Sequence, residues 1–288
     1  MKHRLAAFAA IPLLALGSCA TLDGLGPKVT EVLATPSGNA VTVEEAAAEL
    51  SKYDVVFLGE LHDSVEGHEV MTRLTELLLD GEPAPVLSME MFERDVQDWA
   101  TAYVQGRVCR EAFLANARPW STHEEMYAAA VDMARERGWA LLAANAPRPA
   151  AREVGRHGFR TEDSSIFASN DLDLSDSEYR ERFGAAMGEM SGHGSPGMLD
   201  SMYAAQVLKD ETMAESIARL YAPDGGRWPT VVHWCGRFHS DWGLGTVERL
   251  RRRAPFLEIA VVSMERGSDA VDAARSANPP GLFVIRVP

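Results

Sequence analysis

Residues 54–63, which read Asp-Val-Val-Phe-Leu-Gly-Glu-Leu-His-Asp, decide the fold of this chain. The apolar run at 55–58 lacks the polar alternation of a half-buried strand, so we expect a strand that is covered on both faces. Such strands are typical of parallel sheets, in which crossover helices cover both faces. Similar runs predict further strands at 86–91, 139–144, 230–234, 256–262 and 282–287.

Helical patterns separate these strands. After residue 68, apolar residues recur at the spacing of one helix face, and comparable patterns are found at 95–105, 109–117, 122–137, 198–221 and 244–252. Strands that alternate with helices predict an α/β fold, with a mainly parallel sheet layered between helices. Residues 155–200 are rich in Gly, Ser and Asp, so we expect a partly helical insertion on the surface.

The amino terminus has the features of a bacterial lipoprotein signal. Lys2 and Arg4 precede an apolar run that is too short to span a bilayer comfortably. The run ends in Leu-Gly-Ser-Cys at 16–19, which resembles a lipobox. We therefore expect a signal peptide at 1–18 and a lipid anchor on Cys19.

The segment after Cys19 is expected to lead to a single domain. Residues 19–40 contain several Gly and Pro and are predicted to be a tether, with the folded domain at 41–288. Ala20, rather than Asp, follows the cysteine. We therefore expect the anchored chain to lie at the outer membrane and to face the periplasm.

The charge balance excludes one class of partner. The 288 residues include 28 Lys and Arg against 42 Asp and Glu, a formal net charge of −14. Non-specific binding to DNA or RNA requires clustered cations, so nucleic acid is not an expected partner. The three cysteines have no Cys-x-x-Cys spacing, which excludes a zinc ribbon and a thioredoxin-type site. Cys109 and Cys235 could pair in an oxidising periplasm, but two unrelated, buried thiols are the favoured interpretation.

Charged and imidazole side chains follow the predicted strands. In open parallel sheets, ligands gather at the carboxyl ends of the strands, where Glu60, His62, Glu90 and His239 are expected. Two of these ends carry the same Gly-x-x-His pattern. A set of two histidines and two carboxylates suits a divalent metal ion such as Zn²⁺, Mn²⁺ or Fe²⁺, or general acid–base catalysis. Mutual hydrogen bonding at the sheet edge, without a ligand, is the structural alternative.

Several ordered motifs between about residues 50 and 250 resemble the ChaN family of haem-binding lipoproteins, within the broader Tiki superfamily. The similar segments are 59–63 with His68, 89–92, 145–148, 203–206 with Asp210, Met213 and Ala214, and Gly236 with His239. The lipobox fits the family too. The resemblance implies an α/β fold and a role in haem or iron acquisition, with an outer-membrane haem receptor as a possible partner.

The resemblance also implies how haem is bound. The resemblance implies a dimer that holds two haems face to face. In this arrangement a tyrosine from one subunit ligates each iron, and a histidine from the other subunit contacts the propionates. A phenolate is a suitable donor for ferric haem because it is a hard anionic oxygen ligand. The candidates in this chain are Tyr179 and His193, both in the insertion, and His68, which is expected to face the same cleft as His62.

Two other functions stay open at this stage. The superfamily includes metal-dependent hydrolases, so the second hypothesis is hydrolysis of peptide, ester or amide bonds, with Glu60, His62, Glu90 and His239 around the ion or the attacking water. The third is a lipid-anchored interaction module whose cleft is only structural.

Overall fold

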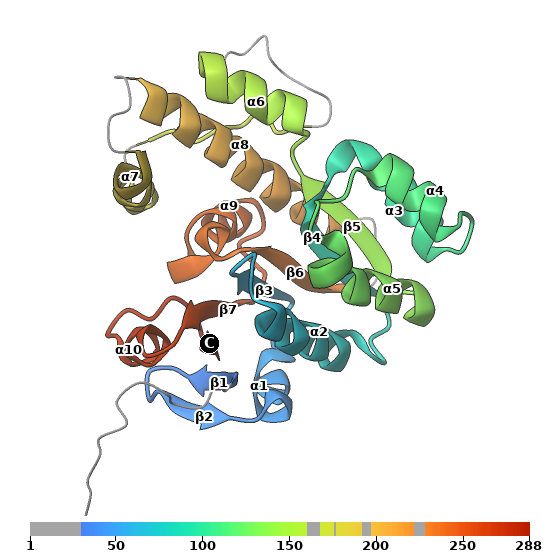
Figure 1. Cartoon of the computed structure of the whole chain (residues 1–288), viewed down its shortest axis with the longest axis horizontal. Coiled ribbons are helices and arrows are strands. Elements are labelled where there is room, and N and C mark those ends of the chain that lie inside the picture. Colours follow the sequence, from blue (N-terminus) through green and yellow to red (C-terminus); the bar gives the residue numbers. More distant parts are fainter. Residues whose placement is uncertain (1–29, 160–167, 176, 192–196, 222–227) are drawn as a thin grey trace, which may run out of the picture.

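An eight-stranded sheet forms the centre of the protein in a computed structural model that describes residues 30–159, 168–175, 177–191, 197–221 and 228–288 (Figure 1). The strand order is β2-β1-β8-β7-β3-β6-β4-β5. The strands are β1 Glu31–Ala34, β2 Asn39–Val41, β3 Val55–Glu60, β4 Pro85–Glu93, β5 Ala140–Asn145, β6 Thr230–Gly236, β7 Ile259–Arg266 and β8 Phe283–Val287. All neighbouring pairs from β8 to β5 are parallel, while β1 is antiparallel to both β2 and β8.

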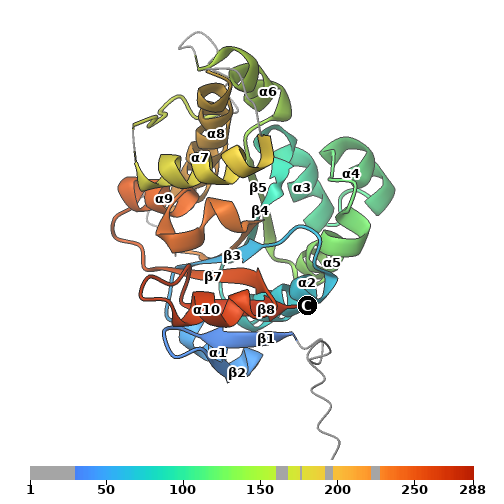
Figure 2. The same cartoon turned by 60° about the vertical axis from the view of Figure 1, so that its left-hand side comes forward.

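Helices cover both faces of the sheet, as Figures 1 and 2 show from two sides. The helices are α1 Val43–Leu50, α2 Val65–Leu79, α3 Gln97–Val104, α4 Arg110–Ala117, α5 Ala128–Arg137, α6 Arg148–His157, α7 Glu178–Ser191, α8 Met198–Ala218, α9 Thr246–Arg253 and α10 Asp269–Arg275. Short 3-10 turns (η1 Arg94–Val96, η4 Arg219–Tyr221, η5 Arg237–His239, η6 Asp241–Gly243) and a π turn (η2 His123–Tyr127) complete the elements discussed below. The α/β fold with a mainly parallel sheet between helices is confirmed.

Strand β3 explains why this fold follows from the sequence. Its side chains point alternately to the two faces, and every residue of the strand is buried. Val56 and Leu58 belong to the core shared with α1, α2 and α5, whereas Val55 and Phe57 belong to the core shared with α8 and α9. Because both faces are covered by helices, the strand is apolar without alternation.

The start of the domain differs from the prediction. Residues 19–40 were expected to be a tether, yet Glu31–Ala34 and Asn39–Val41 form a hairpin at the edge of the sheet. Both strands are short, and β1 is held by pairing with β8, about 250 residues away, which a local pattern cannot reveal. The ordered sheet therefore begins at Glu31. The expected signal peptide and Cys19 lie outside the described residues.

The predicted surface insertion contains a buried helix face. Tyr179 and Phe183 of α7 pack against Tyr203 and Val207 of α8, and α7 crosses α8 near the carboxyl edge of the sheet (Figure 2). The two described cysteines are unpaired: Cys235 is buried as expected, whereas Cys109, at the start of α4, is exposed. No helix in the described part of the chain is long and apolar enough to cross a membrane.

Candidate functional site

The carboxyl ends of β3, β6 and β4 lie side by side, because these strands are neighbours in the sheet. This order brings Glu60, His62, Glu90 and His239 around one cavity of about 390 Å³, which we call the strand-end cleft. Gly236 and Gln206 line it too, and Phe183 and Met187 of α7 form part of its rim. The side chains that the sequence placed at separate strand ends thus face a single cavity.

Glu60 is the centre of the first half of the site. It is the last residue of β3 and 1% exposed, and it contacts the Nδ1 atom of His62 at 2.5 Å and the Nε2 atom of His68. The hydroxyl of Tyr127 donates to the same carboxylate at 3.0 Å. Burial opposes ionisation of Glu60, but the hydrogen bonds from the two histidines outweigh it and lower its pKa. Glu60 is therefore held as a carboxylate inside the protein.

His62 is the accessible member of this half. Its hydrogen bond to Glu60 raises its pKa. Its side chain is 53% exposed, and its ring packs edge-on against Trp120 at 5.1 Å between centroids. A Cβ atom at Gly236 would lie 2.9 Å from His62 Cε1 and 3.1 Å from Nε2, so the ring approaches the backbone of β6 as closely as a glycine allows. His62 thus presents Nε2 toward the cleft while Nδ1 faces Glu60.

The second half of the site is a buried imidazole between two carboxylates. His239 in η5 is 5% exposed, and its Nδ1 and Nε2 atoms lie 2.7 Å from Asp210 and 3.3 Å from Glu90. Burial opposes the charged ring, but the two carboxylates outweigh it and raise the pKa of His239 to about 10. Burial also opposes ionisation of Glu90, whose pKa is nonetheless lowered, chiefly by His239. The backbone N–H of Gly236 donates to Glu90 at 2.8 Å.

Asp210, on α8, links this imidazole to the surrounding helices. It is fully buried and accepts hydrogen bonds from the hydroxyls of Tyr179 at 2.7 Å and Thr246 at 2.8 Å. Burial, with Asp210 as the next cause, raises the pKa of Tyr179 well above its usual value. Tyr179 is therefore a neutral hydrogen-bond donor that fixes Asp210.

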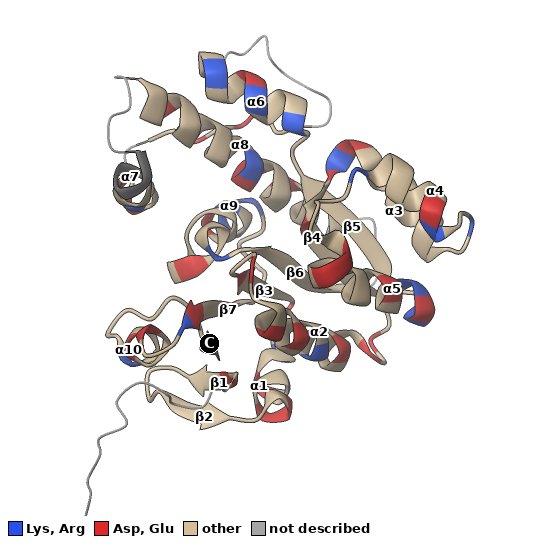
Figure 3. Cartoon of the chain, viewed as in Figure 1, with Lys and Arg blue, Asp and Glu red and all other residues tan. Residues whose placement is uncertain are grey.

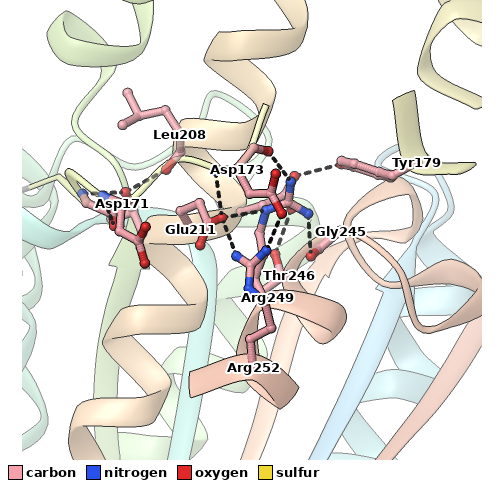
Figure 4. A network of polar contacts seen from close by, with 12 residues as sticks. Asp171, Asp173, Tyr179, Leu208, Glu211, Gly245, Thr246, Arg249 and Arg252 are labelled. Carbon is pink, nitrogen blue, oxygen red and sulfur yellow. Dashed lines mark hydrogen bonds and ion pairs between the residues drawn. The ribbon is translucent and has the colours of Figure 1, made fainter. Parts of the chain in front are cut away.

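The residue that follows Asp210 on α8 lies in a cluster of arginines (Figure 4). Glu211, the next residue on α8, is fully buried and pairs with Arg249 at 3.2 Å, Arg252 at 2.7 Å and Arg253, all three from α9. Arg252 also reaches Asp173, at 2.6 Å, in the segment 168–175 that runs past both helices. These charge pairs connect the two helices that position Asp210 and Thr246.

The metal site expected from the sequence is not supported. The imidazoles and carboxylates are paired with one another: His62 and His68 face Glu60, and His239 lies between Glu90 and Asp210. Their nitrogen and oxygen atoms therefore do not converge on one point where an ion could be bound. Within the described residues, no group of three or more His, Cys, Asp or Glu side chains could hold a metal ion.

The residues expected to bind haem are placed in different ways. His68 is 3% exposed, with Nδ1 2.5 Å from the carbonyl oxygen of Ser64 and Nε2 against Glu60. Tyr179 is 1% exposed and bonded to Asp210. His193 lies outside the described residues. The sequence reasoning from strand ends missed Tyr127 and Asp210, because both lie on helices that only the folded chain brings to the sheet edge.

Comparisons with known proteins agree with this architecture. A family model described as haem-binding uptake, Tiki superfamily, ChaN matches residues 46–250. The structure described as cofacial heme binding to ChaN of Campylobacter jejuni superposes with a TM-score of 0.70 at 16% identity, covering 90% of this chain and 97% of that one. A mutant of the erythromycin esterase EreC reaches a TM-score of 0.47 at 11% identity, covering 82% of this chain and 77% of that chain, which is too weak to carry an argument. Among curated proteins, none matches.

Proposed function

This chain belongs to the ChaN family of haem-binding uptake proteins in the Tiki superfamily, and we therefore propose that it binds haem as part of haem or iron uptake. The observation that carries the proposal is the family match over residues 46–250, which spans the strand-end cleft and α8. The fold likeness to the Campylobacter protein, which extends over nearly the whole of both chains, is consistent with it.

We propose that the protein works from a membrane surface. The Leu-Gly-Ser-Cys sequence at 16–19 supports lipidation of Cys19, with the outer membrane as the location and the periplasm as the compartment. Loss of residues 1–18 removes Lys2 and Arg4 and no acidic residue, so the mature chain has 26 basic against 42 acidic side chains. Haem propionates are anions, so binding has to depend on local cations rather than on the charge of the whole protein. An outer-membrane haem receptor is the proposed source of the ligand.

The described haem candidates do not fit an iron atom as they stand. Tyr179 would have to give up its bond to Asp210, and its raised pKa opposes the phenolate that ferric haem prefers. His68 is committed to Glu60 and Ser64. Either residue could serve only after its surroundings rearrange.

Tyr203 fits haem better. It lies on α8, lines a cavity of about 380 Å³ together with Arg180 and Leu199, and its buried hydroxyl has no hydrogen-bond partner in the described part of the chain. A buried hydroxyl without a partner calls for an explanation, and a bound metal centre would supply one. Met198 and Leu199 beside it are 50% and 42% exposed, an apolar surface of the kind that a porphyrin covers. When bound, haem would supply the iron, and this chain would supply the oxygen donor and the apolar seat.

Titration of the purified protein with haem tests the proposal. We expect a saturable Soret shift in the micromolar range that is lost in Tyr203→Phe. Tyr179→Phe and His193→Ala test two of the three sequence candidates in the same assay, and Tyr53→Phe, a half-buried tyrosine far from α8 in the chain, is the matched control. Absence of any saturable shift would refute haem binding, whereas loss only in Tyr179→Phe would refute the assignment to Tyr203.

We propose that haem is held between two copies of this chain. The exposed apolar residues Met198 and Leu199 support this, because haem bound there by one copy would leave its other face uncovered. Sedimentation velocity with and without haem is the test. We expect the dimer fraction to rise with one haem per chain, and a monomer at saturating haem would contradict the arrangement.

The pairing of His62 with Glu60 favours a second candidate function, metal-independent hydrolysis of an ester or amide. Glu60 fixes the proton on Nδ1, which leaves Nε2 to accept a proton from water in the cleft. The water oxygen then attacks the carbonyl carbon of the ester or amide. The developing oxyanion faces the cationic His239 and Lys209, which line the same cavity. The leaving group finally takes up the proton from His62.

Hydrolysis of p-nitrophenyl acetate in the presence of EDTA tests this candidate. We expect His62→Ala and Glu60→Gln to lower the rate by about 100-fold, since general bases contribute on that order. The matched control is His157→Ala, an exposed histidine on α6 that contacts Glu153 and is remote from the cleft lining. Equal rates in the wild-type protein and His62→Ala would exclude a role for this dyad.

A further inference from the structure

A second cavity lies next to the strand-end cleft. Its volume is about 830 Å³, and it shares Trp120 and Lys209 with the cleft, so the two are adjacent. It is lined by the end of β4, by residues 119–122, by the first turns of α6 and by α8. We call it the Trp120 cavity. Apart from Trp120 and Lys209, which also line the cleft, its residues have no part in the acid–base arrangement or in the haem proposal.

The cations of this cavity exceed its anions. Glu93 is the acidic residue of its lining, and it pairs with Arg148 at 3.1 Å and with Arg118 at 2.8 Å. Arg118 also forms an ion pair with Asp95 at 2.5 Å. The charges of the two arginines are therefore balanced by two carboxylates, Glu93 and Asp95. The other two cations of the lining, Arg152 and Lys209, form no ion pair with the carboxylate of the lining.

Arg152 and Lys209 are available to a ligand. Within the described part of the chain, neither forms an ion pair, although Lys209 lies near enough to Glu90 to help lower its pKa. Basic residues predominate along α6, which carries Arg152 (Figure 3). In a chain with a formal net charge of −14, a concave site with two cations that form no ion pair among the described residues is a local exception.

Trp120 supplies an apolar wall to the same cavity. It is half-buried, packs against the main hydrophobic core and lies with its ring edge-on to His62 and Tyr127. The amino end of α6 also borders the cavity, and Pro147 provides no side-chain cap there, so the helix dipole adds to the field of the two cations. Cations beside a flat aromatic wall are suited to a small anion with an apolar body.

We propose that the Trp120 cavity binds small organic anions, with a carboxylate or phosphate between Arg152 and Lys209 and the apolar part of the molecule against Trp120. The shared residues Trp120 and Lys209 place the rest of such a ligand at the entrance to the strand-end cleft, beside His62. The proposal depends on the cavity and its charges and stands whether or not the chain binds haem.

Isothermal titration calorimetry of the full chain with phenyl phosphate and with benzoate tests the proposal, with benzyl alcohol as the uncharged analogue. We expect saturable binding of at least one anion, none of the alcohol, and weaker binding as the salt concentration rises. Binding of phenyl phosphate alone would mean that the cavity selects a phosphate. Binding of both anions would mean that it accepts a carboxylate as well. Arg152→Ala should weaken binding by about tenfold, as expected for loss of one charge-assisted contact.

Matched variants separate this cavity from its neighbour. Arg152 lines only the Trp120 cavity, whereas Lys209 lines both, so Arg152→Ala isolates the anion site and Arg152→Ala with Lys209→Ala should abolish it. Arg156→Ala, an exposed position on the same helix outside the cavity lining, is the control and should bind as the wild-type protein does. The proposal is wrong if neither anion gives a saturable heat, or if the double variant and the wild-type protein bind equally.

Discussion

Replacement of Asp210 by Asn should destabilise the protein strongly. Asp210 is fully buried and accepts hydrogen bonds from Tyr179 and Thr246 while it pairs with His239 at 2.7 Å. In Asp210→Asn one oxygen becomes an N–H donor that faces groups already donating, and the charged imidazole loses one of its two carboxylates. Breaking a buried pair in this way costs about 3–5 kcal/mol.

The raised pKa of His239 indicates the size of the same effect. A rise from the ordinary value of 6.5 to about 10 corresponds to roughly 5 kcal/mol of preference for the charged ring, shared between Asp210 and Glu90. Because the pKa is raised in the folded state, this stability is fully present below pH 6.5 and is lost as the pH rises through about 10. The difference between the wild-type protein and Asp210→Asn should therefore be largest at and below about pH 6.5 and shrink as the pH rises toward 10.

Thermal and urea unfolding, followed by circular dichroism at a series of pH values, measure the effect. For a domain of this size, 3–5 kcal/mol corresponds to a fall in Tm of roughly 10 °C. The matched control is Asp200→Asn on the same helix, where Asp200 is 65% exposed and pairs with Arg180 at the surface, so we expect a change below about 1 kcal/mol. Equal stability of the two variants, or a difference that does not depend on pH, would refute the reasoning.

Three further predictions concern the surroundings of the site. Gly236→Ala should push the His62 ring away from Glu60, because the new Cβ would lie 2.9 Å from Cε1, and an NMR titration should then find the pKa of His62 closer to its ordinary value. Glu211→Gln should lower the free energy of unfolding by about 3 kcal/mol, measured in urea, because it leaves the buried guanidinium groups of α9 without their carboxylate. Cys109 should react with a thiol reagent in the native protein, whereas Cys235, which is buried and has a raised pKa, should react only after unfolding; equal labelling rates would contradict the described burial.

The sequence was sufficient where a feature depends on one segment. The apolar run of β3 and the residues that follow it predicted a buried parallel strand with polar groups at its carboxyl end. The same reasoning placed Glu90 and His239 at the ends of two further strands, and the sheet order brings those ends together. These features follow from periodicity and strand direction, which are local properties.

The sequence was insufficient where a feature depends on pairing between distant segments. Asp210 contacts His239 across 29 residues, and Tyr127 reaches Glu60 across 67, so neither contact has a local pattern. The resemblance to the family pointed to Asp210 as a motif residue but did not give its role. The expected metal site was not supported for the same reason, since His62, His68 and His239 at the site each already have a carboxylate partner.

The position of β8 has a consequence for how the chain reaches its native state. β8 lies between β1 and β7, and the side chain of Thr35 bonds to the carbonyl oxygen of Leu282, 247 residues later in the chain. Such distant pairing makes folding slow, because the loop must close before the contact contributes. A chain that emerges amino terminus first therefore cannot complete its sheet until residues 283–287 are free. This delay agrees with the export that we propose, since a chain that threads through a membrane channel must remain unfolded until it has passed.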